Sequence, residues 1–112
     1  MSDLPVFGAG IWHFATYVDR YATEGYGDPV GLIEQIDKAG AVGDLSVVDL
    51  NWPFAGFDGT LDDVRAALAR NNLRAVAITP EIYNREYVKG SITNPDPAVR
   101  AKALALLHEA TE

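Results

Sequence analysis

A chain of 112 residues is long enough for one domain with a single core and too short for two ordinary domains. Hydrophobic residues make up 48% of the chain and charged residues 22%, which excludes a disordered or fibrous protein. The formal net charge of -7 argues against nucleic acid and anionic membrane surfaces as partners, because both repel an acidic protein.

Targeting and membrane signals are missing from the sequence as given. The start "MSDLPVF" has no basic segment followed by a long apolar one, and no window approaches the roughly 20 apolar residues of a membrane span. There is also no cysteine for disulfides. We therefore expect a cytoplasmic protein.

Three apolar segments predict β-strands, and a helical pattern follows each one. The predicted strands cover about 6–15, 45–54 and 74–83, and the predicted helices cover about 29–39, 61–71 and 97–111. Asp28-Pro29 and Asp96-Pro97 each place a capping residue before a proline, which is typical of a helix start, and Thr60 with Asp63 fits a capping box. The apolar runs are nearly continuous, which predicts parallel strands covered on both faces. The expected fold is α/β, with three consecutive βα units in one single unit, 1–112.

The loops that follow the strands are longer than those that follow the helices. They cover 16–28, 55–59 and 84–96, whereas the helices return to the next strand within a few residues. Ligands of parallel α/β proteins bind beyond the carboxyl ends of the strands. The sequence therefore predicts a site at that end.

The second strand ends in polar residues, in "SVVDLNWPF". Asp49 and Asn51 share one parity and are candidate ligand contacts at the carboxyl end. Two interpretations stay open, because Asp49 also suits accepting backbone N–H groups from a neighbouring loop and Asn51 suits a turn.

In the first strand, "GAGIWHF" places Gly8, Gly10 and Trp12 on one face by alternation. An indole at the mouth of a strand suits the C–H face of a sugar ring, and the alternative is a core tryptophan. His13 is a candidate for proton transfer, although opposite parity to Trp12 equally favours a structural histidine.

The third strand ends in "ITPEIY", where Glu81 and Tyr83 share a parity. Glu81 is a candidate ligand for a sugar hydroxyl or a cation, and the alternative is a solvated loop carboxylate.

Four segments in order resemble xylose isomerases and the wider xylose isomerase-like TIM-barrel superfamily. They are "FGAGIWHFA", "DPVGLIEQIDKAGAVG", "DLNWPF" and "ITPEIYNREYVKGSITNPDPAVRAKAL", and together they cover nearly the whole chain. The resemblance implies that the chain is the N-terminal part of a (β/α)8 barrel, which takes about 250 residues when complete. It also implies that Trp12 and Tyr83 help to wall a sugar pocket.

The resemblance further implies a metal-dependent sugar isomerase or epimerase acting on a sugar or a sugar-like polyol. A divalent metal (Mn, Mg or Co) is implied, with its ligands expected outside this chain and with no metal ligand assigned here. The histidine that xylose isomerases carry after the second strand is absent, since this chain reads "VVDLNWPF" there. The implied partners are a small-molecule sugar and either further copies of the chain or the remaining part of the barrel.

Whether this chain is an enzyme stays open at this point, because three βα units alone are expected to be inactive. The alternative is a non-catalytic α/β module that binds a ligand or partner through the same loops. A nuclease of the same superfamily is disfavoured by the net charge.

Overall fold

A computed structural model describes residues 4–17, 21–22, 25–54 and 57–112 of the chain. Along the chain the elements are β1 (Phe7–Gly10), the 3-10 helix η1 (Ile11–Phe14), α1 (Leu32–Ala41), β2 (Leu45–Trp52), α2 (Leu61–Arg70), β3 (Arg74–Pro80), the 3-10 helix η2 (Arg85–Tyr87) and α3 (Pro97–Glu109). The predicted loops 16–28 and 55–59 lie partly outside the described residues.

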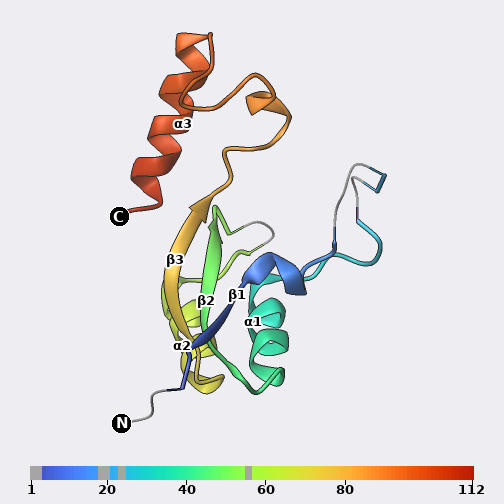
Figure 1. Ribbon diagram of the computed structural model, residues 1–112. Coiled ribbons are helices and arrows are strands. Elements are labelled where there is room, and N and C mark those ends of the chain that lie inside the picture. The colour runs from blue at the N-terminus through green and yellow to red at the C-terminus, as the bar shows by residue number, and fades with distance from the viewer. Residues whose placement is uncertain (1–3, 18–20, 23–24, 55–56) are drawn as a thin grey trace. The chain divides into compact units, whose positions relative to one another are not determined.

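The three strands form one parallel sheet in the order β1-β2-β3 (Figure 1). β1 pairs with β2 through Gly8 opposite Val47 and Gly10 opposite Asp49, after an irregularity between Phe7 and Gly8. A helix follows each of β2 and β3, and α1 connects β1 to β2. The predicted α/β fold of βα units with parallel strands is therefore confirmed.

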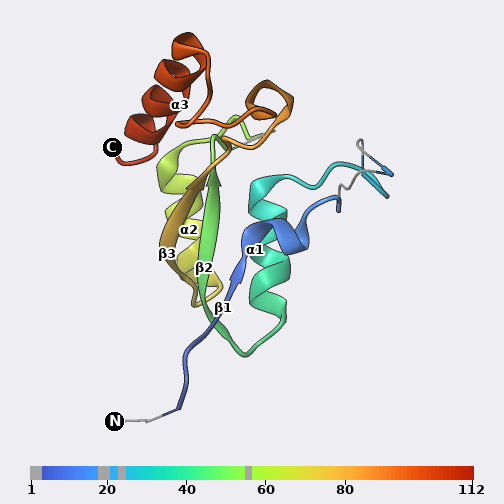
Figure 2. The same ribbon diagram turned by 45° about the horizontal axis from the view of Figure 1, so that its top comes forward.

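The described residues form two compact units. The first comprises the described residues within 4–50 and 54–77, and the second comprises residues 51–53 and 78–112. In the first unit, α1 and α2 pack against each other on the same side of the sheet (Figure 2). The core of this unit consists of apolar residues from both helices, from β2 and from η1: Ile11, Leu32, Ile36, Ala39, Val48, Leu50, Val64, Ala67, Leu68 and Leu73.

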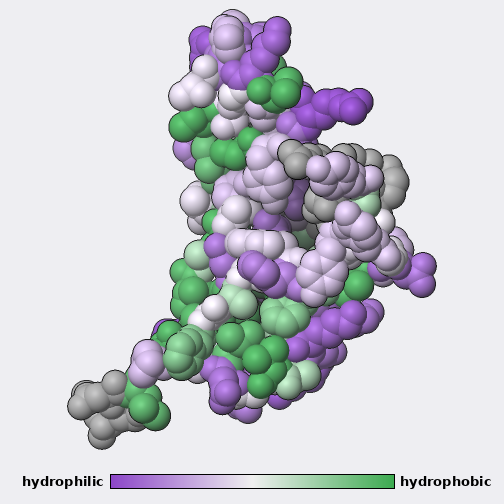
Figure 3. Space-filling view, turned by 45° about the vertical axis from the view of Figure 1, so that its right-hand side comes forward, coloured by the Kyte–Doolittle hydropathy of each residue, from purple (hydrophilic) through white to green (hydrophobic). Residues whose placement is uncertain are grey.

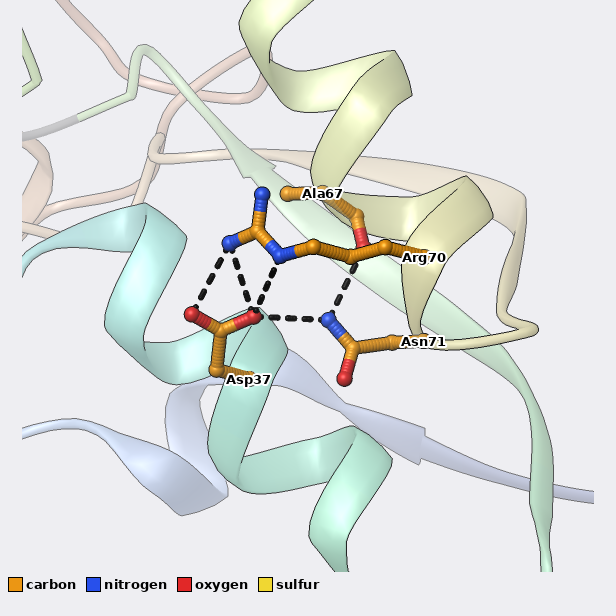
Figure 4. A network of polar contacts seen from close by, with 4 residues as sticks. All are labelled: Asp37, Ala67, Arg70 and Asn71. Carbon is orange, nitrogen blue, oxygen red and sulfur yellow. Dashed lines mark hydrogen bonds and ion pairs between the residues drawn. The ribbon is translucent and has the colours of Figure 1, made fainter.

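A polar network joins α1 to α2 at the edge of this core (Figure 4). The guanidinium of Arg70 donates to both carboxylate oxygens of Asp37, at 2.8 and 2.9 Å from Nη2, and the side chain of Asn71 donates to the same carboxylate at 2.7 Å. These hydrogen bonds lower the pKa of Asp37 below its usual range, and the hydrogen bond from Arg70 has the largest effect. The network adds a polar link between two helices whose apolar faces pack in the core.

The helix starts show where the sequence prediction succeeds and where it fails. The predicted capping box at α2 is confirmed, because Thr60 accepts from the Asp63 N–H and the Asp63 carboxylate accepts from the Thr60 N–H. The predicted start of the first helix at Asp28-Pro29 is wrong, because α1 begins at Leu32 after the extended residue Gly31. The side chain of Gln35 donates to the Val30 carbonyl at 2.7 Å, which holds residue 30 in place ahead of the helix.

Two strand predictions also need correction. The predicted strand 6–15 is shorter in the structure, because the chain turns into η1 at Ile11 and buries that side chain in the core, with 1% of its surface exposed. The prediction of strands covered on both faces is wrong, because β2 buries only Val48 and Leu50 on its helix-facing side, and residues 74–78 of β3 are all exposed. β3 is an edge strand of the sheet, and its Val76 is 55% exposed.

The second unit is organised around a hydrogen-bonded loop that leads into α3. The buried Asn94 donates from its side chain to the Gly90 carbonyl at 2.6 Å and accepts from the Asp96 N–H at 2.9 Å. Asp96 in turn caps α3 by accepting from the Ala98 N–H, so the predicted start of this helix is confirmed. The guanidinium of Arg100 closes the loop by donating to the Asn94 carbonyl.

Hydrophobic side chains also lie at the surface. Figure 3 shows them in green beside the N-terminal segment, where Leu4, Val6 and Phe7 are 79%, 66% and 57% exposed. Among the described residues, no helix has both the length and the apolar character that crossing a bilayer requires.

Candidate functional site

Trp12 lies against the end of β1, although it is not part of that strand. It belongs to η1, and its indole ring covers the position where Gly10 would carry a side chain. A Cβ atom added to Gly10 would lie within 2.5 Å of three atoms of the ring, closer than any real Cβ contact. The predicted strand assignment of Trp12 is therefore wrong, although the 3-10 turn still folds the indole onto the Gly10 face of the strand end.

Asp49 lies next to Gly10 on the neighbouring strand. The two residues are opposite each other in the parallel register, so their side-chain directions point to the same face of the sheet. That face is the one away from the helices, because the alternate residues Val48 and Leu50 are buried in the core. The indole of Trp12 and the half-buried side chain of Asp49 therefore share one face at the carboxyl ends of β1 and β2.

His13 follows Trp12 in η1 and is exposed. Its Nδ1 atom lies 3.0 Å from the carbonyl oxygen of Gly10. The imidazole and indole ring centroids are 5.8 Å apart, with the ring planes tilted by 33°. Trp12, His13 and Asp49 thus all gather around Gly10 in the first unit.

The second unit contains the other predicted contacts. The side-chain amide of Asn51 donates to the hydroxyl of Tyr83 at 3.1 Å. The Glu81 N–H donates to the Trp52 carbonyl at 2.8 Å, which extends the pairing of β2 and β3 beyond the end of β3. The predicted strand 74–83 is therefore shorter, since β3 ends at Pro80 and Tyr83 lies in the following loop.

Glu81 is the carboxylate among the candidate residues of the second unit. Its side chain is partly buried, and this burial raises the pKa of the carboxyl above its usual range. Tyr83 is 65% exposed, so its ring is accessible while its hydroxyl contacts Asn51.

The six predicted residues thus fall into two groups. Trp12, His13 and Asp49 surround Gly10 in the first unit, whereas Asn51, Glu81 and Tyr83 lie in the second unit. Strand alternation puts Gly10 and Trp12 on one face but does not predict that the indole packs directly on Gly10. The signal was present, because a glycine two positions before a large aromatic residue at a strand end is where a close approach would occur.

The described residues do not form a metal centre. No group of three or more histidine, aspartate or glutamate side chains is arranged to hold an ion in this part of the chain. Asp49 contributes a carboxylate to the first unit and Glu81 contributes one to the second. These groups suit hydrogen bonds to hydroxyls, which carboxylates accept strongly.

No family model matches this sequence, and no curated protein matches it with significant similarity. A functional assignment accordingly depends on the chemistry and the geometry of the residues themselves.

Proposed function

We propose that this chain is the N-terminal part of a xylose isomerase-like TIM barrel and that its strand ends bind a sugar or a sugar-like polyol. The observation that carries this proposal is the placement of Trp12 and Asp49 on one face, at the carboxyl ends of adjacent parallel strands. Barrel enzymes bind their substrates at this end of the strands.

The chemistry of this pair favours a polyhydroxylated ligand. An indole face packs against C–H groups, and Trp12 is 41% exposed, so part of its surface is available. A carboxylate accepts hydrogen bonds from hydroxyl groups, and Asp49 supplies one beside the indole. A sugar ring presents both surfaces, whereas an anionic ligand is repelled by the net charge of -7.

The proposed reaction is that of a cytoplasmic isomerase or epimerase in carbohydrate metabolism. Such a reaction is assisted by a divalent metal (Mn, Mg or Co) that polarises sugar oxygens. We propose that its ligands lie outside this chain, so that this part supplies a wall of the pocket and is inactive alone. The exposed edge strand β3 supports a partner in the form of the remaining barrel or of further copies of the chain.

Ligand titration followed by NMR tests the binding proposal. The two tryptophans give two indole N–H signals, which Trp12→Phe and Trp52→Phe assign. We expect D-xylose and xylitol to shift the Trp12 signal saturably, with a dissociation constant in the millimolar range. Removing the charged acceptor in Asp49→Asn should weaken binding about tenfold or more, since hydrogen bonds to charged groups are the stronger ones.

The control variant is Asp58→Asn, which removes an exposed carboxylate from another loop and should leave the affinity unchanged. A Trp12 indole signal whose chemical shift does not change with either polyol would contradict the proposal. Saturable binding without metal-dependent turnover, even after the missing strands are supplied, would instead favour the non-catalytic module.

A further inference from the structure

The contact between His13 and Gly10 determines which ring nitrogen of His13 is the hydrogen-bond donor. Nδ1 lies 3.0 Å from the Gly10 carbonyl oxygen, and a carbonyl oxygen only accepts hydrogen bonds. Nδ1 must therefore carry the hydrogen. In the neutral imidazole the other nitrogen, Nε2, then has a lone pair and acts as an acceptor.

The acceptor nitrogen belongs to an exposed ring beside the indole. The His13 and Trp12 centroids are 5.8 Å apart, so a ligand ring lying on the indole comes within reach of the imidazole. Within residues 4–17, 21–22, 25–54 and 57–112, the hydrogen bond of the His13 ring uses Nδ1 and leaves Nε2 to solvent or ligand.

Gly10 connects this histidine to the other two groups. The carbonyl of Gly10 holds the imidazole, the Cα of Gly10 supports the indole, and the strand register places Asp49 beside the same residue. One apolar surface is thus accompanied by two hydrogen-bond acceptors. Such a set is matched by a ligand with a C–H face and at least two hydroxyl donors.

We propose that Nε2 of His13 accepts a hydrogen bond from one hydroxyl of the polyol that lies on Trp12, and that this contact selects a free hydroxyl over its methyl ether. This inference rests on the proposed function, because it assumes a ligand on Trp12. The contact of His13 with Gly10 uses Nδ1, so the fold does not occupy Nε2. The proposed role of Nε2 in ligand selection is therefore separate from the structural contact.

The experiment compares His13→Asn with the wild-type chain. The asparagine amide can donate to the Gly10 carbonyl as Nδ1 does, but it has no atom at the position of Nε2. The probes are D-xylose and its mono-O-methyl ethers, with affinity read from the Trp12 indole signal and the state of the imidazole read from the Nε2 nitrogen shift.

We expect D-xylose to move the Nε2 shift of the wild-type chain, and one ether to bind about two- to tenfold more weakly than D-xylose. His13→Asn should lose a similar factor toward D-xylose and should no longer discriminate against that ether. A Trp12 signal that responds to D-xylose while Nε2 does not move would overturn the inference and leave the proposed function standing. No response at Trp12 would overturn both.

The Nε2 measurement uses the wild-type chain, so the inference stays open to refutation even if His13→Asn folds poorly. Equal affinity of D-xylose and all its ethers for the wild-type chain would also overturn it.

Discussion

Replacing Gly10 by alanine tests the arrangement on which the candidate site depends. The added methyl group would lie within 2.5 Å of three atoms of the Trp12 ring, whereas carbon atoms in contact lie about 3.5–4.0 Å apart. The indole must therefore move, because the three nearest atoms all belong to its ring and Gly10 itself is held in the pairing of β1 with β2.

The burial of Trp12 sets the size of the effect. The side chain is 41% exposed, so about three-fifths of it is covered, and a tryptophan buries up to about 250 Å². Complete expulsion of the ring would expose about 150 Å², which corresponds to about 3–4 kcal/mol at ~25 cal/mol per Å². We expect Gly10→Ala to lower the free energy of unfolding by about 1–3 kcal/mol, since the ring can shift part of the way and keep some contacts.

Urea denaturation of Gly10→Ala, followed by circular dichroism, measures this loss. Gly27→Ala is the matched control, because its Cβ meets nothing within 4 Å, and it should unfold like the wild-type chain. The Trp12 indole signal should move in Gly10→Ala and stay in place in the control. An unchanged indole signal and an unchanged midpoint in Gly10→Ala would refute the packing of Trp12 on Gly10.

Four further predictions concern stability and association. Asp37→Ala should lower the free energy of unfolding by under about 1 kcal/mol, because this carboxylate is half-exposed. Since folding lowers the pKa of Asp37, its contribution to stability is present above the unfolded pKa and is lost as the pH falls through the folded pKa. Denaturation at several pH values measures this loss, and Asp62→Ala is the exposed control. Thr60→Ala should lower the free energy of unfolding, measured by thermal denaturation, by about 1 kcal/mol, and Thr60→Ser should lower it much less, because serine keeps the capping hydroxyl. Equal losses in the two variants would contradict the capping box. Asn94→Ala should lower the free energy of unfolding by about 1–3 kcal/mol, because it removes both side-chain hydrogen bonds of the buried Asn94. Amide hydrogen exchange should become faster in residues 78–112 and stay unchanged in the first unit. Equally faster exchange in both units would be inconsistent with two units. The wild-type chain should show a molar mass that rises with concentration in light scattering, and Val76→Lys should reduce it by placing a charge on the edge strand, whereas a strictly monomeric wild type would count against an associating edge.

The order of elements was predictable because it depends on local signals. Apolar runs bounded by glycine or proline marked the strands, and the Thr60 box and Asp96-Pro97 marked two helix starts that the structure confirms. The start of α1 was not predictable in the same way, because Asp28-Pro29 carries the same signal as Asp96-Pro97. What differs is the residues that follow, because Val30 and Gly31 stay extended and the Val30 carbonyl accepts from the side chain of Gln35, a hydrogen bond that the capping pattern alone does not reveal.

The candidate site was predictable in position and not in geometry. Asp49 lies in a regular strand, where alternation and register suffice to place it on the face away from the helices. Trp12 lies past the end of β1, and the burial of Ile11 turns the chain before it. Strand alternation therefore does not apply from Ile11 onward, and the position of Trp12 follows instead from the packing of its indole on Gly10.

The absence of a side chain at Gly10 lets three groups from two elements, Trp12 and His13 of η1 and Asp49 of β2, lie around one strand end. A residue with a side chain at position 10 would keep the indole away from the strand end and would separate it from Asp49. Its carbonyl remains free of that steric conflict and accepts from His13. An indole, a carboxylate and an imidazole are thus placed around one backbone position, and the proposed polyol would contact the first through its C–H face and the other two through its hydroxyls.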